Sequence, residues 1–207
     1  MKAFVDETAT WDDRRRREFV EWLCVRLEPH PEAAHRATRP QMVERLVHPT
    51  LRKWTGTNIN DPRPHRWLGL LFAGYRFYRR NAENDPPVNA KEHLRKAIAI
   101  DPREQPSRIR LVELLIDDIL WDTHHLPHYY IGDPELTLEV AEDALRVAAG
   151  VEDPLERDAL EHAIGTAERL VEDWLDFKEA RGVDFAAWCL EHGRSPEWVR
   201  HYYFRAG

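Results

Sequence analysis

Residues 90–100, AKEHLRKAIAI, decide the fold that we expect for this chain. Their apolar positions recur at helical spacing, and Pro102 ends the segment because proline cannot continue a helix. The segment before it, HRWLGLLFAGYRFYRR (65–80), is apolar on most of its circumference and should therefore be central. The small side chain of Ala97 would let the two helices approach closely, with Leu94 filling the space between them. These segments predict an antiparallel helix pair in the middle of the chain.

Helical periodicity extends over most of the remaining sequence, and alternating β-branched runs or Asn-Gly hairpin turns are almost absent. Further helices are expected over residues 11–27, 42–54, 107–122, 134–149 and 154–181. Asp133 and Asp153 each place a capping carboxylate before a proline, which marks a helix start. Pro49 interrupts another pattern and predicts a kink or two short helices. The predicted fold class is all-α, either a helical bundle or a short α-solenoid of antiparallel helix pairs.

The length of 207 residues suits a single domain, 1–207, with three parts. We expect N-terminal helices in 1–57, helix pairs in 64–154, and a long capping helix followed by two short helices in 154–207. The loop TGTNINDPRP (55–64) is the clearest internal boundary. Hydrophobic residues make up 43% of the chain and charged residues 32%, which indicates a globular protein rather than a disordered one.

Charge and composition argue against several classes of partner. The net charge is −7, and acidic and basic residues alternate along the chain, so no nucleic-acid partner is expected. The single basic cluster, DDRRRRE (12–18), places acids four residues before bases, which is typical of a self-paired, solvated helix face. Cys24 and Cys189 lie apart in apolar helical contexts and are expected to be buried thiols. With no long apolar run and no signal-like N-terminal segment, we expect no membrane partner and a cytoplasmic location.

The middle of the chain, about residues 64–154, resembles the tetratricopeptide repeat family. The resemblance rests on small and apolar residues at the family's spacing. In the first pair these are Leu70, Ala73, Gly74 and Phe77, then Ala90, Leu94, Ala97 and Pro102. In the second pair they are Leu111 and Leu115, then Ala141, Leu145, Ala148 and Pro154. The resemblance implies stacked helix pairs whose concave face binds a protein or peptide, and the family has no shared catalytic residues.

The chain departs from the family pattern in two loops. The loop between the first two helices is several residues too long. The second pair contains an insertion of roughly seventeen residues against a period of about 34. That insertion includes WDTHHLPHYY (121–130), which has three histidines, two tyrosines, a tryptophan and an aspartate. Long inserted loops are often functional, so this segment is the candidate site.

Two kinds of site are open for this loop. His124 and His128 have the i, i+4 spacing of a helical metal pair, although Pro127 disfavours a regular helix between them. With Asp117 or Asp118 they form a conceivable metal or acid–base cluster, and the candidate metal ligands are Asp118, His124 and His128. Alternatively, the loop recognises a partner through its rings. The candidate binding residues are Trp121, His124, His125, His128, Tyr129 and Tyr130.

The leading hypothesis is a non-enzymatic helical scaffold that binds a protein or peptide beside helix 65–80 and the 121–132 loop, without a cofactor. The alternative is a metal-dependent enzyme on a helical bundle that uses the Asp/His cluster at 117–128. A homodimer formed through the apolar stripe of 154–181 is a third hypothesis, and a purely structural role for the loop is the simplest one. The other histidines are expected on the surface, namely His35, His48, His65, His93 and His162.

Overall fold

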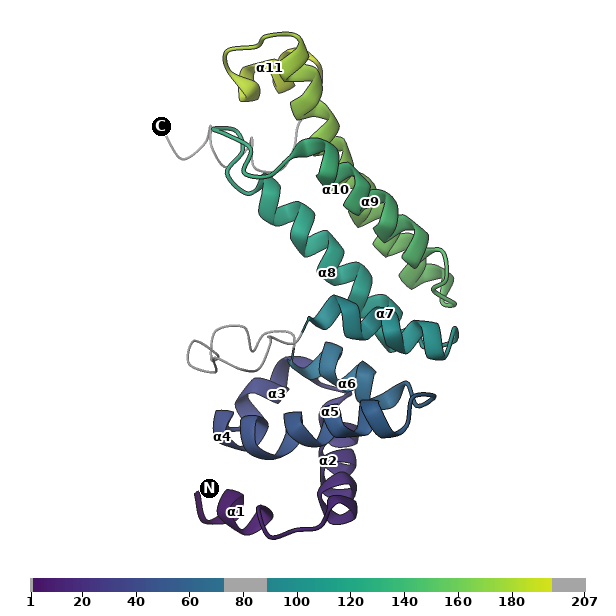
Figure 1. Cartoon of the computed structure of the whole chain (residues 1–207). Helices are drawn as coiled ribbons and strands as arrows, with labels where there is room; N and C mark the ends of the chain where they lie inside the picture. Colours follow the sequence, from purple (N-terminus) through teal and green to yellow (C-terminus); the bar gives the residue numbers. More distant parts are fainter. Residues whose placement is uncertain (1, 73–88, 195–207) are drawn as a thin grey trace. The chain divides into compact units, whose positions relative to one another are not determined.

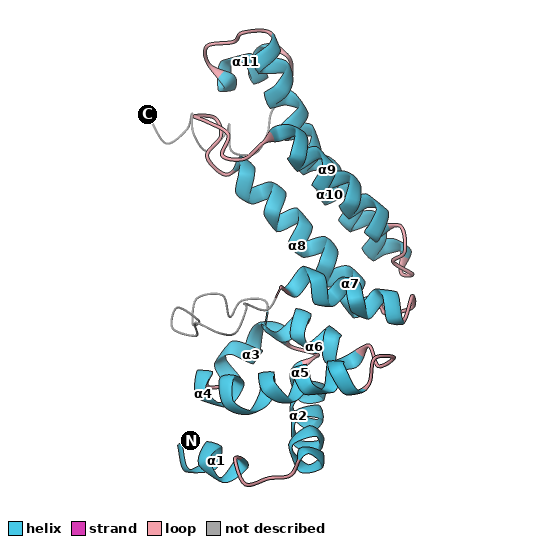
Figure 2. Ribbon diagram, viewed as in Figure 1, coloured by secondary structure: helices cyan, strands magenta, loops and turns pink. Residues whose placement is uncertain are grey.

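The computed structural model describes residues 2–72 and 89–194, and in these ranges it contains helices and no strand (Figures 1 and 2). The helices are α1 (Lys2–Thr8), α2 (Asp13–Leu27), α3 (Pro31–Ala37), α4 (Pro40–Met42), the π-helical segment η1 (Val43–Val47), α5 (His48–Thr57), α6 (Arg63–Phe72), α7 (Ala90–Ile100), α8 (Gln105–Thr123), α9 (Pro134–Ala148), α10 (Pro154–Glu179) and α11 (Phe185–Glu191). The all-α prediction is therefore confirmed. The second half of the predicted helix 65–80 and the second short C-terminal helix lie outside the described residues.

The chain divides into two compact units, which we call the N-terminal unit (Met1–Leu111) and the C-terminal unit (Val112–Gly207). The boundary falls inside α8, and not near residue 60 or 154, where the sequence placed its subdivisions. The expected loop at 55–64 joins α5 to α6 within the N-terminal unit. Each unit has a hydrophobic cluster of its own.

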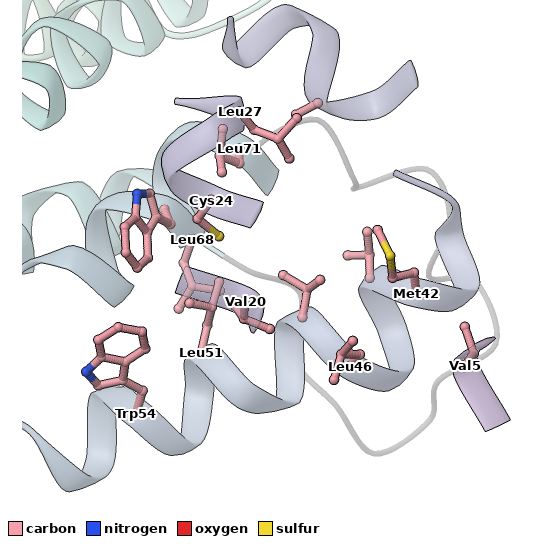
Figure 3. Close-up of a cluster of buried hydrophobic side chains, with 14 residues drawn as sticks. Val5, Val20, Cys24, Leu27, Met42, Leu46, Leu51, Trp54, Leu68 and Leu71 are labelled. Atoms are coloured by element: carbon pink, nitrogen blue, oxygen red, sulfur yellow. The ribbon is translucent and has the colours of Figure 1, made fainter. Parts of the chain in front are cut away.

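The core of the N-terminal unit is built from the inward faces of its helices (Figure 3). Its largest fully buried side chains include Leu46, Leu51, Trp54, Trp67 and Leu68. Trp54 and Trp67 meet edge to face, with ring centroids 5.6 Å apart. Edge-to-face contacts bring the positive ring edge to the negative ring face, which adds to the stabilisation from burial.

Helices α6 and α7 form the most extensive helix pairing in this unit, and Leu94 and Ala97 are fully buried, as their spacing predicted. The close approach occurs at Gly69. A Cβ atom placed there would lie 2.4 Å from Cγ of Leu94, so only glycine fits without a shift of the neighbouring helix. The close approach of α6 and α7 is thus made at Gly69, whereas the sequence analysis assigned it to Ala97.

The run from α4 to α5 shows how the chain accommodates Pro49. Proline lacks an N–H and would clash with the carbonyl of Arg45 in a regular α-helix. The structure contains the π-helical turn Val43–Val47 directly before α5, which opens the backbone at this point. The hydroxyl of Thr50 donates to the carbonyl oxygen of Leu46 at 2.6 Å. The predicted interruption is therefore a local π-helical turn within a continuous helical run.

Two of the histidines assigned to the surface are instead buried, so that prediction was wrong for them. His48 is 4% exposed and His65 is 9% exposed. Nδ1 of His65 lies 2.9 Å from Nδ1 of His93, between α6 and α7. Burial lowers the pKa of both imidazoles, that of His93 to about 4. A neutral imidazole can donate at one nitrogen and accept at the other, which lets the pair be buried without a charge.

In the C-terminal unit, α9 and α10 lie side by side and form its most extensive pairing (Figure 1). The resemblance had paired 107–122 with 134–149, whereas the closest partner of α9 is α10. Both predicted caps are present: Asp133 accepts the Glu135 N–H at 3.1 Å, and Asp153 accepts the Leu155 N–H at 2.9 Å. None of the helices described is long and apolar enough to cross a bilayer.

The second hydrophobic cluster lies where α10 and α11 meet the loop after α8. Its buried members are Leu126, Phe177, Phe185 and Cys189, with Tyr130, Leu170, Trp174 and Trp188 packed against them. Cys24 is fully buried in the other unit, so both cysteines are free, buried thiols, as predicted. Burial raises the pKa of Cys189 to about 11, which keeps this thiol protonated near neutral pH.

Candidate functional site

The loop between α8 and α9 is held closed at its two ends by Asp122. The Ile131 N–H donates to the carbonyl oxygen of Asp122 at 3.1 Å, and the Thr137 hydroxyl donates to its carboxylate at 2.9 Å. A Cβ atom at Gly132 would lie 2.6 Å from the same carboxylate, so a larger residue here would displace the Asp122 side chain. A carboxylate near the C-terminal end of a helix is disfavoured by the macrodipole, and here the Thr137 hydroxyl offsets part of that cost.

Two apolar anchors hold the middle of the loop. Leu126, which precedes a cis peptide bond to Pro127, is 3% exposed and belongs to the second hydrophobic cluster. The ring of Tyr130 stacks on Trp174 of α10, with centroids 6.1 Å apart and planes inclined by 25°. Tyr130 was predicted as a binding residue, and the structure places it against the core.

Four other rings of the loop form a continuous row, which we call the ring row: Trp121, His124, His125 and Tyr129. His125 is half-buried, and the other three are exposed. Neighbouring ring centroids lie 4.6 Å apart for Trp121 and His124, 4.1 Å for His124 and His125, and 4.6 Å for His125 and Tyr129. Trp121 is 66% exposed and Tyr129 is 51% exposed. The His124 ring also contacts the carbonyl oxygen of Trp121 through Nδ1. Four of the six sequence-predicted binding residues thus lie in the ring row, whereas Tyr130 is a partly buried anchor.

Further exposed apolar side chains come from the helix ends beside the loop, namely Leu120, Ile131 and Leu136. Scattered single apolar residues on a surface are ordinary, but several large ones together indicate an interaction site. His128 is exposed, and its backbone N–H donates to the carbonyl oxygen of His125 at 3.0 Å.

The structure does not assemble the alternative metal set. In the ranges 2–72 and 89–194, no group of three or more His, Cys, Asp and Glu side chains is placed to hold a metal ion. Asp118, His124 and His128 all fall within those ranges. The rings of this loop therefore contact one another and do not form a convergent set of metal ligands.

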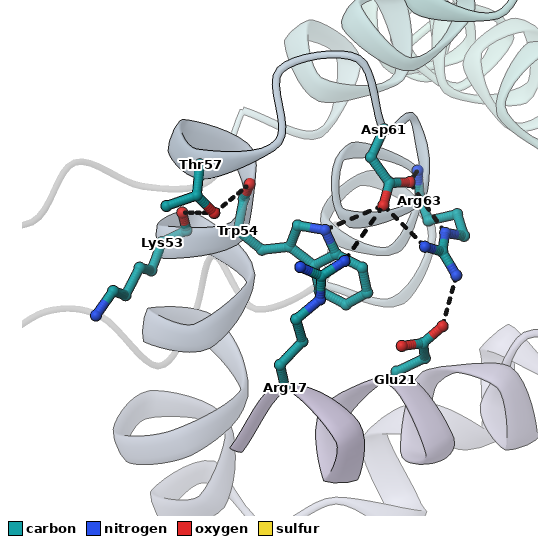
Figure 4. Close-up of polar contacts among 7 residues, drawn as sticks. All are labelled: Arg17, Glu21, Lys53, Trp54, Thr57, Asp61 and Arg63. Carbon is teal, nitrogen blue, oxygen red and sulfur yellow. Dashed lines mark hydrogen bonds and ion pairs between the residues drawn. The ribbon is translucent and has the colours of Figure 1, made fainter. Parts of the chain in front are cut away.

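A hollow with a volume of about 460 Å³ lies in the N-terminal unit, between α2 and α5. Three arginines of the DDRRRRE cluster and Lys53 line it, together with Trp54 (Figure 4 shows the adjoining contacts). Arg16 donates to the carbonyl oxygens of Thr8 and Ala9, at 3.2 and 2.7 Å. Lys53 pairs with Asp13 at 2.5 Å, and this contact lowers the pKa of the carboxyl group.

Two guanidinium groups lie close to the ring of Trp54 in the same region. The guanidinium carbon of Arg17 lies 3.8 Å from the ring centroid and that of Arg63 lies 5.2 Å from it. The indole N–H donates to Asp61 at 3.1 Å (Figure 4). Although burial acts to raise the pKa of Asp61, its hydrogen bonds from Arg63 bring that pKa below its usual value. The basic cluster, predicted to be a self-paired surface, thus stabilises the unit through carbonyl and ring contacts.

The two units differ sharply in charge. Residues 1–111 contain 22 Lys and Arg against 15 Asp and Glu, whereas residues 112–207 contain 8 against 22. Residues 111–145, which include the ring row, contain nine Asp and Glu and no Lys or Arg. Alternation of charge along the whole chain conceals this difference. Counting charges separately on the two sides of residue 111 would have found it.

Comparison of the chain with models of known protein families, with curated proteins and with solved structures gave no match.

Proposed function

We propose that this protein is a non-enzymatic helical scaffold that binds a protein or peptide through the ring row. The observation that carries the proposal is the run of four successive ring contacts on the loop, in which Trp121 and Tyr129 are each more than half exposed. Aromatic side chains supply large contact areas at a low cost in conformational entropy, and they dominate interface energies. Exposure of these apolar ring surfaces to water is unfavourable, so burying them against a partner would lower the free energy.

The loop is also arranged before any partner arrives. Leu126 and Tyr130 fix it to the second hydrophobic cluster, and Asp122 closes its ends. A surface that is already ordered loses less entropy on binding, which raises its affinity for a given contact area. The close packing of α6 with α7 is consistent with the scaffold role implied by the tetratricopeptide resemblance. A cytoplasmic location is part of the proposal, supported by the two free cysteines.

The test compares Trp121→Ala/Tyr129→Ala with Trp22→Ala in a pull-down from extract of the native cells. Trp22, on α2, is 56% exposed and lies in the other unit, so it is a matched loss of an exposed ring. Partners retained by the unaltered chain and by Trp22→Ala should be lost by the double variant. We expect a loss of about tenfold or more in affinity, the scale of a binding hot spot.

Thermal unfolding of the double variant should match that of the unaltered chain, because neither ring belongs to a core cluster of the described residues. Equal retention of the same partners by all three proteins would refute the proposal. If Trp22→Ala lost the same partners, exposed rings in general, and not the ring row, would be the cause of capture.

A further inference from the structure

The charge around the ring row narrows the chemistry of its partner. Resting on the proposed function, we infer that the segment held on the ring row is cationic: a stretch of another protein that carries arginine and lysine side chains. The inference joins two independent observations. One is the ring row, with Trp121 and Tyr129 more than half exposed, and the other is the stretch 111–145, in which nine Asp and Glu residues occur with no Lys or Arg.

Arginine is the side chain that such a surface suits best. Its planar guanidinium stacks on aromatic rings, and it pairs with carboxylates through two parallel hydrogen bonds. Asp117 lies four residues before Trp121 on α8, and both side chains are exposed. Residues at this spacing are neighbours on one helix face, with Cβ atoms about 5–6 Å apart. A guanidinium on the Trp121 ring therefore has a carboxylate within reach.

The start of α9 supplies the other carboxylates. Glu135 and Glu139 are exposed on its first two turns, and Asp133 caps it. Their field acts at the loop itself: burial raises the pKa of Tyr130, and the charges of Asp122, Asp133 and Glu135 raise it further. An anionic segment would be repelled here, and a neutral one would gain nothing from these charges.

A second copy of the chain is the main competing occupant, because the N-terminal unit carries an excess of Lys and Arg. In that unit, however, Arg16 and Arg17 of the basic cluster already contact carbonyl oxygens, the Asp61 carboxylate and the ring of Trp54. A separate protein segment with free arginines fits the ring row better. We commit to that occupant, and the test includes self-association as an outcome.

The experiment selects peptides from a random 12-residue library on the full-length chain, then measures their affinities in solution by fluorescence anisotropy. Selected peptides should have a net positive charge and contain arginine. Their affinity should fall about tenfold when NaCl is raised from about 0.1 M to about 1 M, since the Debye length falls from about 10 Å to about 3 Å. Trp121→Ala/Tyr129→Ala should also weaken binding about tenfold or more.

Two triple variants with the same change of net charge locate the effect. Asp117→Asn/Glu135→Gln/Glu139→Gln removes carboxylates beside the ring row and should weaken binding about tenfold. Glu156→Gln/Asp158→Asn/Glu161→Gln removes three at the start of α10. The 15 residues of α9 separate that position from the loop by about 20 Å, at about 1.5 Å per residue. This exceeds the Debye length, so binding should change less than about twofold.

The outcomes separate this inference from the proposed function. Selected peptides that are neutral or acidic, but need Trp121 and Tyr129, would overturn the cationic partner and leave the scaffold standing. Binding that is unaffected by Trp121→Ala/Tyr129→Ala would overturn both. Equal weakening by the two triple variants would replace the local site by diffuse attraction to the whole unit. Salt-sensitive self-association in sedimentation, abolished by the Asp117 triple variant, would make the occupant a second copy and overturn the separate partner.

Discussion

Replacing Gly69 with alanine tests the close contact between α6 and α7. The added Cβ would lie 2.4 Å from Cγ and 2.5 Å from Cδ2 of Leu94, and 3.1 Å from the carbonyl oxygen of Ala90. Carbon atoms in contact are normally about 3.5–4.0 Å apart, so the neighbouring helix has to move by about 1 Å. Leu94 is fully buried, and close-packed protein interiors leave little room for a side chain to turn.

Two opposing effects set the size of the change. Overpacking a core costs about 1–3 kcal/mol, while alanine is favoured over glycine in a helix by about 1 kcal/mol. Steric contact with both a side chain and a backbone oxygen places Gly69→Ala toward the costly end. We therefore expect a net loss of about 1–2 kcal/mol in the free energy of unfolding of the N-terminal unit.

A double-mutant cycle with Leu94→Ala isolates the contact. Leu94→Ala alone should cost about 2–5 kcal/mol, because it leaves a cavity. In that background the methyl group at residue 69 enters the vacated space, so Gly69→Ala should stabilise the unit by up to about 1 kcal/mol. The reversal of sign corresponds to a coupling energy of about 2 kcal/mol between the two positions.

The assay is urea unfolding followed by circular dichroism, with amide hydrogen exchange of α6 and α7 to assign the transition to this unit. Gly165→Ala in α10 is the control, since the nearest atom to its added Cβ is Nη1 of Arg169 at 3.9 Å. That substitution should stabilise its helix by about 0.5–1 kcal/mol. If Gly69→Ala stabilised the chain to the same extent, α6 and α7 would not be in close contact and the packing argument would be wrong.

Two ionisable groups of the N-terminal unit give further predictions. Glu104, 5% exposed, receives two bonds from Arg66 at 3.1 and 3.0 Å, so Glu104→Ala should cost about 3–5 kcal/mol in urea unfolding and Glu104→Gln distinctly less. The lowered pKa of His93, about 4, means that the unfolded chain binds its proton more readily, so stability should fall from about pH 7 to pH 4. Solvent screening limits the loss to about 1–2 kcal/mol. Unfolding titrations of His93→Gln should show a smaller step, since the lowered pKa of His65 contributes the remainder, and a step of undiminished size would assign it elsewhere.

The elements predicted correctly from sequence are those with local signals at both ends. Residues 90–100 form α7 with the predicted bounds, because the segment has a polar cap before it and Asp101–Pro102 after it. The caps at Asp133 and Asp153 act within three residues of themselves, so sequence alone identifies them. The first long helix was predicted from residue 11 but begins at Asp13, with Asp12 as its cap. The Asp12 side chain accepts the Arg15 N–H at 2.7 Å, and this hydrogen bond places the helix start two residues later than predicted.

What sequence reasoning missed depends on contacts between distant residues. Burial of His65 requires His93, which is 28 positions away and supplies the partner nitrogen. The loop was identified as a candidate site from its composition. The separation of Tyr130 from the exposed rings, however, depends on Trp174, which lies on α10, 44 positions later in the chain. Nothing in WDTHHLPHYY itself shows which of its two tyrosines faces the core.

That separation would let one short loop serve both folding and the recognition that we propose. Leu126, Tyr130 and Asp122 bear the structural contacts of the loop, and each would destabilise it if replaced. Trp121 and Tyr129 remain largely exposed, and their apolar area lowers solubility without adding to the core. A chain selected only for folding would gain from polar residues at these two positions. The presence of these two rings beside a stretch rich in carboxylates and without Lys or Arg is what the proposed partner would account for, since it would cover the rings and neutralise the charge.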